Sequence, residues 1–452
     1  MTKSHSPNVP PTLKKVLIVS PHFPPINAPD MQRVRMSLPY YRAHGWEPVV
    51  LAVGKDWQLG VNEPNLLSTV PSDVRVVNVK ALSPNWSGWI GIGNLGLRAW
   101  PSLFRTGSRL LGGEKFDLVF FSNTQFMTFV LGRVWRWRFN VPYVIDIQDP
   151  WRTDYYERAG SRKPPGGWKY LFARLNAWIF EGWCYAKASG FVSVSPAYFD
   201  ELAGRYPWFS SKPQAVIRFG ASTADLDLAR GLRPSALAKP RPDSATHFLY
   251  TGASGPVMPQ AISVLFAALR SYKALKPEQA RQLRFHFIGT SYVEPGKGKF
   301  TVLPLATEFG VVDQVEEIPY RIGFLESLRF QLDTDVLLLP GSSDPAYSPS
   351  KVYLYYLAGL PMLGLVFKES VMENLLRELS CSYLVSIDVL GTTDVAQKEI
   401  HRFFDLALSG FPPGSLPTRN KSYFEAHYLA DELTRLQCAL FDRAIPSEKT
   451  SQ

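Results

Sequence analysis

The chain has 452 residues, and its 46% hydrophobic and 19% charged residues exclude an intrinsically disordered protein. Because single hydrophobic cores stop growing near about 300 residues, this length predicts at least two domains. The formal net charge of +10 predicts an anionic partner, either a phosphorylated small molecule or an anionic membrane surface. Nucleic acid is not expected, since the sequence has neither zinc-finger spacing nor an RNA-recognition-motif signature.

The three cysteines indicate a reducing compartment. Cys184, Cys381 and Cys438 are far apart and form no CxxC pair, which argues against a disulfide framework and against a zinc site. No run approaches the roughly 20 apolar residues of a membrane span, and the N-terminus lacks the apolar region of a signal peptide. We therefore expect a cytoplasmic protein, with a peripheral position on the inner face of the membrane as a further option.

Strands and helices alternate along the N-terminal half. Residues 1–13 are polar and rich in proline, so we expect them to be disordered. A helix is predicted over 30–45, ending at Gly45. Buried strands are predicted at 14–20, 47–53, 73–79, 116–123, 142–149, 188–195 and 214–220. Apolar strands separated by helices are typical of a parallel α/β sheet, here in a domain over 14–224.

A second α/β series follows a proline-rich segment at 225–245, which we interpret as a linker. The second domain is expected over 246–419, with a helix at 258–275. Its strands are predicted at 246–252, 283–290, 315–320, 334–340 and 361–366. A last helix, at 420–443, is able to pack back on the N-terminal domain. The simplest architecture is two doubly wound, Rossmann-like domains facing each other across a ligand cleft.

Several enzyme classes are excluded by missing motifs. No GxGxxG follows the first strand of either domain, which argues against a nicotinamide dehydrogenase. The sequence also lacks GxxxxGK[ST], GxSxG and HExxH. A DTD stretch occurs at Asp333–Asp335, but it precedes a buried strand, whereas a ligand site should follow one. We therefore interpret it as a turn or a strand boundary rather than a metal site.

The stretch YSPSKVYLYYLAGLP, at 347–361, is the clearest candidate site. Ser348 and Pro349 suit a helix start, and Gly359 suits its end. Such a start leaves amides without helical partners at the positive end of the helix dipole, and it directly follows a strand. These amides belong to Ser350, Lys351 and Val352. A helix N-terminus with a lysine is suited to bind a phosphate group, although a plain helix start is the alternative.

Two strand-end loops in the N-terminal half carry candidate polar residues. The loop after 142–149 contains Asp149 and Trp151, and carboxylates with aromatic rings suit sugar binding. Alternatively, an aspartate caps a helix there and the tryptophan packs beneath it. His22 follows the first strand, either as a ligand contact or as a structural histidine.

Two helices combine tryptophan with arginine or lysine. They contain GRVWRWRF, at 132–139, and GGWKYLFARLNAWIFEGW, at 166–183. Helices of this kind can lie at a bilayer interface. An ordinary amphipathic helix with its apolar face on the core is the alternative, and the sequence leaves both readings open.

These segments together resemble glycosyltransferase family 4. The N-terminal matches are KKVLIVSPHFPP, PYVIDIQDPW, ASGFVSVSPAYFDEL and AVIRFGAS. The C-terminal matches are RFHFIGT, DTDVLLLPG and SPSKVYLYYLAGLPML, of which the last is the strongest. The resemblance covers about residues 14–440. It implies a GT-B fold and a retaining, metal-independent enzyme without a cofactor, which transfers a sugar from a nucleotide-sugar donor to a glycan, a lipid-linked or another hydroxyl acceptor.

The resemblance also distributes the site residues between the domains. The donor diphosphate is expected at Ser350, Lys351, Val352, Arg218, Gly252 and Gly255. The donor nucleoside and sugar are expected at Asp344, Tyr347 and Leu354. His22 and Asp149 are the expected catalytic residues, which position the donor sugar or the acceptor, and Asp30 and Trp151 lie on the acceptor side.

The chain departs from the family pattern at three places. NAPDMQR, at 27–33, replaces the usual glycine pair of the first loop, so either Arg33 or Arg35 serves phosphate instead or the loop only packs. TGASGPVMP, at 251–259, lacks the usual arginine and lysine. Leu354 stands where the family has a glutamate that holds the donor ribose, and leucine accepts no hydrogen bond.

The departures keep two alternatives open. A catalytically silent GT-B scaffold that binds a partner protein or a membrane is favoured by Leu354. A sugar-nucleotide epimerase, which needs no acceptor, is the third option. The sequence names neither the sugar nor the nucleotide base.

Overall fold

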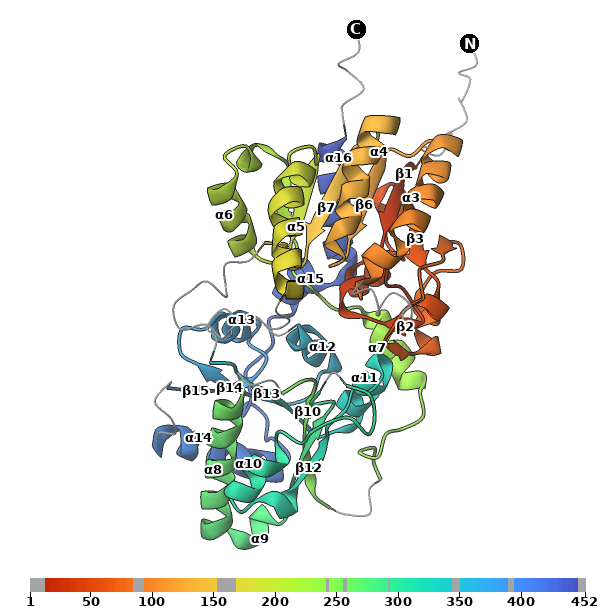
Figure 1. Ribbon diagram of the computed structural model, residues 1–452. Helices are drawn as coiled ribbons and strands as arrows, with labels where there is room; N and C mark the ends of the chain where they lie inside the picture. The colour runs from red at the N-terminus through yellow and green to blue at the C-terminus, as the bar shows by residue number, and fades with distance from the viewer. Residues whose placement is uncertain are drawn as a thin grey trace, which may run out of the picture. The chain divides into compact units, whose positions relative to one another are not determined.

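The computed structural model describes residues 13–83, 93–152, 168–240, 244–254, 258–291, 293–343, 350–388 and 394–445. The segment expected to be disordered, 1–13, lies outside this part of the chain except for Leu13. The chain divides into two compact units. The first comprises Met1–Phe219 with Ala430–Gln452, and the second comprises Gly220–Leu429. Each unit is built around its own parallel sheet (Figure 1).

The first unit contains a seven-stranded parallel sheet in the order β5-β3-β1-β6-β7-β8-β9. Its strands are β1 (Lys14–Val19), β3 (Trp46–Val53), β5 (Arg75–Val79), β6 (Leu118–Ser122), β7 (Tyr143–Ile147), β8 (Gly190–Ser193) and β9 (Gln214–Val216). All seven predicted strands are confirmed. The central strands β6 and β7 are buried along their whole length, because helices cover both faces of a parallel sheet.

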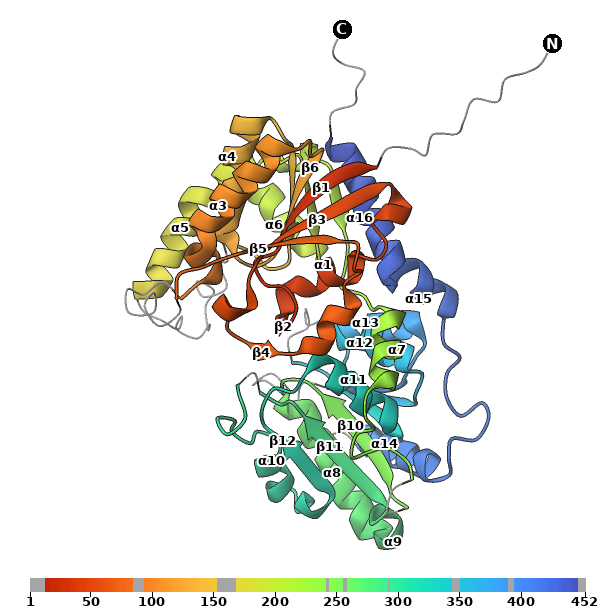
Figure 2. The ribbon, with the colours of Figure 1, turned by 90° about the vertical axis from the view of Figure 1, so that its right-hand side faces the viewer.

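Helices form a layer on each face of this sheet. Figure 2 shows α3, α4 and α5 on one side of the strands and α16 on the other. The first layer consists of α3 (Leu95–Gly113), α4 (Phe129–Phe139), α5 (Trp168–Tyr185) and α6 (Pro196–Arg205). The second consists of α1 (Gln32–Ser37) and α16 (Ala430–Ala444). Alternate residues of β1 point to the two layers: Leu17 packs in the core under α3 to α6, and Ile18 in the core under α1 and α16.

The second unit contains a six-stranded parallel sheet in the order β12-β11-β10-β13-β14-β15. Its strands are β10 (Thr246–Thr251), β11 (Leu283–Ile288), β12 (Val315–Ile318), β13 (Val336–Pro340), β14 (Met362–Phe367) and β15 (Tyr383–Ile387). The first five confirm the predicted strands, whereas β15 was not predicted. Its helices are α7 (Thr223–Gly231), α8 (Pro259–Leu275), α9 (Pro277–Ala280), α10 (Leu303–Glu308), α11 (Phe324–Asp333), α12 (Lys351–Ala358), α13 (Val371–Leu379), α14 (Asp394–Leu408) and α15 (Lys421–Tyr428).

Minor elements complete the loops. A two-stranded antiparallel ribbon joins β2 (Ile26–Asn27) to β4 (Val61–Asn62). Short 3-10 helices occur at Pro29–Met31, Arg42–His44, Lys55–Trp57, Pro64–Thr69, Phe126–Thr128, Phe209–Ser211 and Val312–Gln314.

Two predicted helices and the predicted linker differ from the observed elements. The single helix expected at 30–45 is interrupted after Ser37, because Pro39 has no amide to continue the hydrogen-bond ladder. The segment expected as a linker contains α7, which packs against α11. The last predicted helix, 420–443, is two helices in different units, α15 and α16.

Candidate functional site

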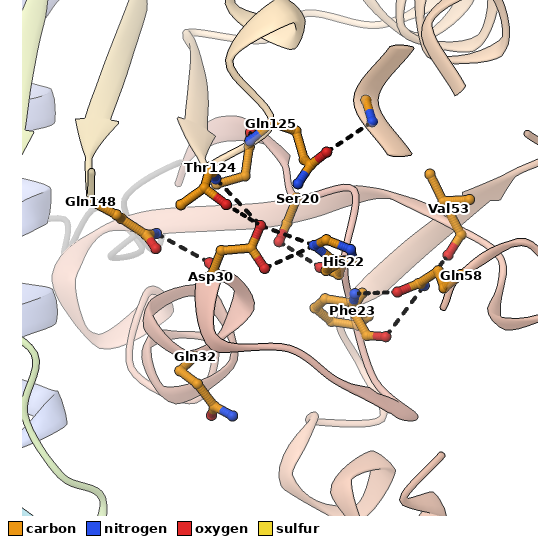
Figure 3. A network of polar contacts seen from close by, with 12 residues as sticks. Ser20, His22, Phe23, Asp30, Gln32, Val53, Gln58, Thr124, Gln125 and Gln148 are labelled. Carbon is orange, nitrogen blue, oxygen red and sulfur yellow. Dashed lines mark hydrogen bonds and ion pairs between the residues drawn. The ribbon is translucent and has the colours of Figure 1, made fainter. Parts of the chain in front are cut away.

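The first candidate site lies in the loop after β1, where His22 contacts Asp30. The Nδ1 atom of His22 is 2.9 Å from Oδ1 and 3.0 Å from Oδ2 of Asp30 (Figure 3). Thr124, in the loop after β6, donates to Oδ2 of the same carboxylate from its amide at 3.3 Å and its hydroxyl at 3.1 Å. Residues from two separate loops therefore meet, because the carboxyl ends of neighbouring parallel strands share one edge of the sheet.

Gln148, directly after β7, connects this site to the core beneath it. Its Nε2 atom donates to the backbone oxygen of Asp30 at 3.1 Å and to Oδ2 of Asp146 at 2.9 Å. The side chain of Gln148 is buried, so these hydrogen bonds are shielded from water. The end of β7 thus fixes the loop that carries Asp30.

The electrostatic environment acts in opposite directions on the two carboxyl groups near this edge. Burial raises the pKa of Asp30, but the hydrogen bond and positive charge of His22, with the Thr124 hydrogen bonds, outweigh it and lower the pKa. Partial loss of water raises the pKa of Asp149, and the negative charge of Asp30 adds to this rise. Because Asp149 is exposed, solvent weakens the effect on it.

The arginine considered for phosphate binding is part of the core instead. Arg33 Nε lies 2.8 Å from Oδ2 of Asp146, and its Nη2 donates to the backbone oxygen of Ile217 at 2.6 Å. Arg33 is 4% exposed and Asp146 fully buried, so the guanidinium is unavailable to a ligand. Arg35 is buried as well and donates to Gln32. Of the two readings of this loop, the one in which it only packs is supported.

Trp151 does not present a free face to a sugar. Its ring stacks on Phe126 at a centroid distance of 5.6 Å and contacts Phe129 edge-on at 5.7 Å. The side chain is 9% exposed. Neighbouring aromatic residues cover the ring, which favours the alternative in which the tryptophan packs, and the acceptor-side role of Trp151 stays a prediction. The rest of this loop, from residue 153, lies outside the described residues.

The second candidate site lies in the second unit, at the start of α12. Lys351 is the first residue of this helix, which follows β13. Its Nζ atom lies 2.6 Å from the hydroxyl of Tyr250 and 4.0 Å from the centroid of the Tyr250 ring. A Cβ atom on Gly252, in the loop after β10, would lie 2.7 Å from Nζ. Gly252 also has a φ of +120°, so the backbone conformation favours glycine there, and a Cβ atom would displace the lysine amine.

The amine of Lys351 has an unusual protonation equilibrium. Burial lowers the pKa of Lys351 to about 7, since no carboxylate within the described residues forms an ion pair with it. An anion placed against the amine would favour its charged form and raise this pKa. The N-terminal amides of α12 add positive potential at the same point. The arrangement is therefore suited to bind a diphosphate.

Tyr355 and Gln331 hold the end of β10, and sequence reasoning missed both. The Tyr355 hydroxyl accepts from the amide of Thr251 at 2.9 Å, and Gln331 donates to the Thr251 hydroxyl at 2.9 Å. All three residues are buried, and Thr251 directly precedes Gly252. In the sequence, Tyr355 is only a tyrosine on the apolar face of a predicted helix. Such a tyrosine cannot be distinguished from an ordinary core residue.

The other predicted residues of α12 are placed as follows. Ser350 is the N-cap residue, but its side chain makes no capping hydrogen bond. The side chain of Val352 is buried, so only its amide is able to meet a ligand. Leu354 is half-buried and packs against an apolar cluster that includes Tyr353. Gly359 ends the helix with a φ of +82°, as expected.

A pocket of about 630 Å³ opens beside the same loop of the second unit. Its wall includes Ser254 after β10, Thr290 after β11, and Lys297. Glu317, in β12, fixes the loop between β11 and α10. Its carboxylate accepts hydrogen bonds from Thr290 at 2.6 Å and from the amides of Thr301, Val302 and Leu303 at 2.9 to 3.0 Å. No sequence pattern indicates this pocket, because its walls come from separate loops.

Several predicted residues remain predictions. Gly255, Asp344 and Tyr347, as well as Ser348 and Pro349, lie outside the described residues. Arg218 is half-buried in the first unit, after β9.

The DTD stretch is confirmed as a strand boundary. Asp333 pairs with Arg329 at 2.6 Å, and Asp335 accepts from the amide of His247 at 2.9 Å. Within the described residues, no cluster of three histidine, cysteine or acidic side chains is arranged to hold a metal ion. No helix in that part of the chain is both long and apolar enough to cross a bilayer.

Comparison with known families finds one match, in the N-terminal half of the chain. Residues 32–220 match the family of glycosyl transferase 4-like domains. This part of the chain is therefore similar to glycosyl transferase 4-like domains, which agrees with the resemblance to glycosyltransferase family 4. No curated protein matches the sequence significantly.

Solved structures confirm the GT-B fold with two Rossmann-like domains. Sucrose-phosphate synthase from Thermosynechococcus elongatus is 12% identical with a TM-score of 0.56, over 95% of this chain and 98% of that one. The N-terminal domain of Candida albicans trehalose-6-phosphate phosphatase is 11% identical with a TM-score of 0.53, over 98% and 99%. UDP-GlcNAc 2-epimerase from Neisseria meningitidis, bound to UDP-GlcNAc, is 14% identical with a TM-score of 0.50, over 95% and 100%. At such identities the similarity shows the fold alone.

Proposed function

We propose that this protein is a retaining glycosyltransferase that transfers a sugar from a nucleotide-sugar donor to a hydroxyl group of a glycan or a lipid-linked acceptor. The observation that carries the proposal is Lys351. This half-buried amine without a carboxylate partner in the described residues stands at a helix N-terminus and against Gly252. A helix N-terminus with a buried amine stabilises an anionic leaving group best.

In this proposal the second unit binds the donor. Lys351 and the amides of Ser350 and Val352 hold the diphosphate and stabilise the negative charge that develops as the bond to the sugar breaks. The positive potential comes from the protein itself, so the proposed reaction needs no metal ion. Asp344 and Tyr347 are proposed to contact the nucleoside or sugar.

The first unit is proposed to act on the acceptor side. His22 and Asp149 position the acceptor or the donor sugar, and Asp30 holds the His22 ring through its Nδ1 atom. That contact leaves the Nε2 atom of His22 for a substrate hydroxyl. Arg218 is proposed to meet phosphate. A cytoplasmic protein on an anionic membrane surface, as the net charge of +10 favours, would find lipid-linked acceptors there.

The test is a binding and turnover panel with UDP-, GDP- and ADP-sugars. We expect one of these donors to raise the melting temperature of the wild-type protein, and Lys351→Ala to abolish that shift. Lys368→Ala is the matched control, because Lys368 is an exposed lysine of the same unit. No shift with any donor would refute the proposal. Conversion of the donor without an acceptor would instead indicate an epimerase.

A catalytically silent scaffold is the second candidate, and Leu354 is the observation that favours it. This side chain packs against apolar residues and offers no acceptor for a ribose hydroxyl. A scaffold of this kind would bind no donor, and Leu354→Glu would not create donor binding. If the protein is a transferase, the same variant is expected to keep or tighten donor binding, which calorimetry would measure.

A further inference from the structure

Helix α5 carries a continuous apolar stripe that the described residues of the first unit leave exposed. The α5 stripe consists of Leu171, Phe172, Leu175, Trp178 and Ile179. Their side chains are between 47% and 67% exposed. Their spacing of one, three or four residues places them on one side of the helix. Large apolar side chains gathered in this way on an outer surface mark an interaction site, whereas single exposed ones are ordinary.

The same surface extends over the two neighbouring helices. α3, α4 and α5 lie side by side on one face of the sheet in both views (Figures 1 and 2), and α4 contacts both of the others. Trp137, on α4, is 86% exposed, although Trp135 of the same helix is buried in the core. The sequence had left open whether these helices face the core or a membrane. The structure shows that α4 places Trp135 in the core and Trp137 on the outer surface.

The charge of this surface is almost entirely positive. The sequences of α3, α4 and α5 contain eight arginine or lysine residues and one acidic residue. That acid, Glu181, is buried and paired with Arg205. Among the side chains of these helices whose exposure is described, the exposed basic ones are Arg105, Arg109, Arg138 and Arg174. Asp200 and Glu201 lie on the next helix, α6, and there the basic surface ends.

We propose that the outer face of α3, α4 and α5 docks on an anionic lipid bilayer. The α5 stripe would enter the region between head groups and acyl chains, where tryptophan is favoured because its ring is apolar and its N–H is polar. Arginine side chains beside it would reach lipid phosphates while their aliphatic stems stay on the apolar boundary. A protein partner would not require a surface free of exposed acids over three helices. The proposal does not depend on the proposed transferase activity.

The primary test is co-sedimentation of the full chain with vesicles. Vesicles of phosphatidylcholine with about 30% phosphatidylglycerol supply the anionic surface, and pure phosphatidylcholine vesicles are the reference. We expect binding to the anionic vesicles, weakened by salt. The double variant Leu175→Asp/Trp178→Asp should lower the partition constant at least about tenfold, which corresponds to about 1.4 kcal/mol. Leu275→Asp is the control, since Leu275 is 71% exposed on α8 of the second unit.

A labelled cysteine locates the contact directly. The three native cysteines are buried, so Leu171→Cys is the residue that an environment-sensitive dye should label in the folded protein. We expect its emission to shift to the blue with anionic vesicles, and that of Leu275→Cys to stay unchanged.

Three results would overturn the proposal. They are no binding of the wild-type chain, equal binding by the Leu175→Asp/Trp178→Asp variant, and a wild-type dimer that this variant dissociates without any vesicle binding. The last result would mean that a second copy of the chain covers the stripe. Circular dichroism of the variant verifies that it is folded. Donor binding is measured separately, so failure of docking is distinguished from failure of the proposed function.

Discussion

The protonation of Lys351 gives a quantitative prediction about donor binding. In the free protein the pKa of Lys351 is about 7, because burial disfavours the ammonium form. A bound diphosphate should favour that form and raise the pKa, so binding takes up a proton. Below about pH 6 most of the amine is already charged, so affinity should be nearly constant there. Between pH 7 and pH 9 the charged fraction of the free protein falls from about one half to about one hundredth, so affinity should fall roughly fiftyfold.

Isothermal titration calorimetry with a nucleotide sugar is the assay. The diphosphate of such a donor has no ionisation near neutral pH, so its own titration does not obscure that of the lysine. In two buffers of different ionisation enthalpy, the uptake at pH 7 should be about half a proton. Lys368→Met should retain this behaviour, whereas Lys351→Met should bind weakly and without pH dependence. An affinity that stays constant from pH 6.5 to pH 9, or binding without proton uptake, would refute the reasoning.

Three further predictions concern the fold around the two sites. Gly252→Ala should displace the lysine amine and weaken donor binding about tenfold or more by calorimetry, whereas Gly231→Ala, where a Cβ meets nothing within 4 Å, should not. Because the pKa of Asp30 lies below 3.8 in the folded state, its carboxylate stabilises the protein at neutral pH and loses this effect as the pH falls through that lowered value. The melting temperature of the wild-type protein should therefore exceed that of Asp30→Asn at pH 7, and the two melting temperatures should converge in acid. Arg33→Met should lower the free energy of unfolding by about 3–5 kcal/mol in urea titrations, because it leaves the Asp146 charge buried without a partner. The double variant Arg33→Met/Asp146→Leu should recover part of this loss. A loss below about 1 kcal/mol would contradict a buried ion pair.

The elements that follow local rules were predictable. The strands β1, β10 and β13 are runs of apolar residues with breakers at their ends, and such runs need no knowledge of their neighbours. The end of α12 was also predictable, since Gly359 is the residue type that a left-handed helix cap requires. The prediction of one helix over 30–45 was wrong. It rested on the helical spacing of apolar residues and gave too little weight to Pro39, which interrupts the backbone hydrogen bonds of a helix.

The roles of individual side chains were harder to predict. Arg33 and Trp151 have the chemistry of ligand contacts, and both are enclosed by core residues that lie far away in the sequence. Tyr355 has the pattern of a core residue, and it fixes the strand end on which the glycine loop depends. Whether a polar or aromatic side chain faces a ligand or the core depends on contacts between distant segments, which periodicity does not report.

The sequence by itself determined the two α/β series, the helix start at Ser350–Lys351, and a leucine at 354, where the family resemblance implies a ribose-binding glutamate. These features depend on residue type and local spacing. Only the tertiary structure decided that the Lys351 amine lies on Tyr250 and against Gly252, and that the α5 stripe is left uncovered. Both features depend on which distant residues surround a side chain. These surroundings set the pKa of Lys351 and the exposed fraction of Trp178.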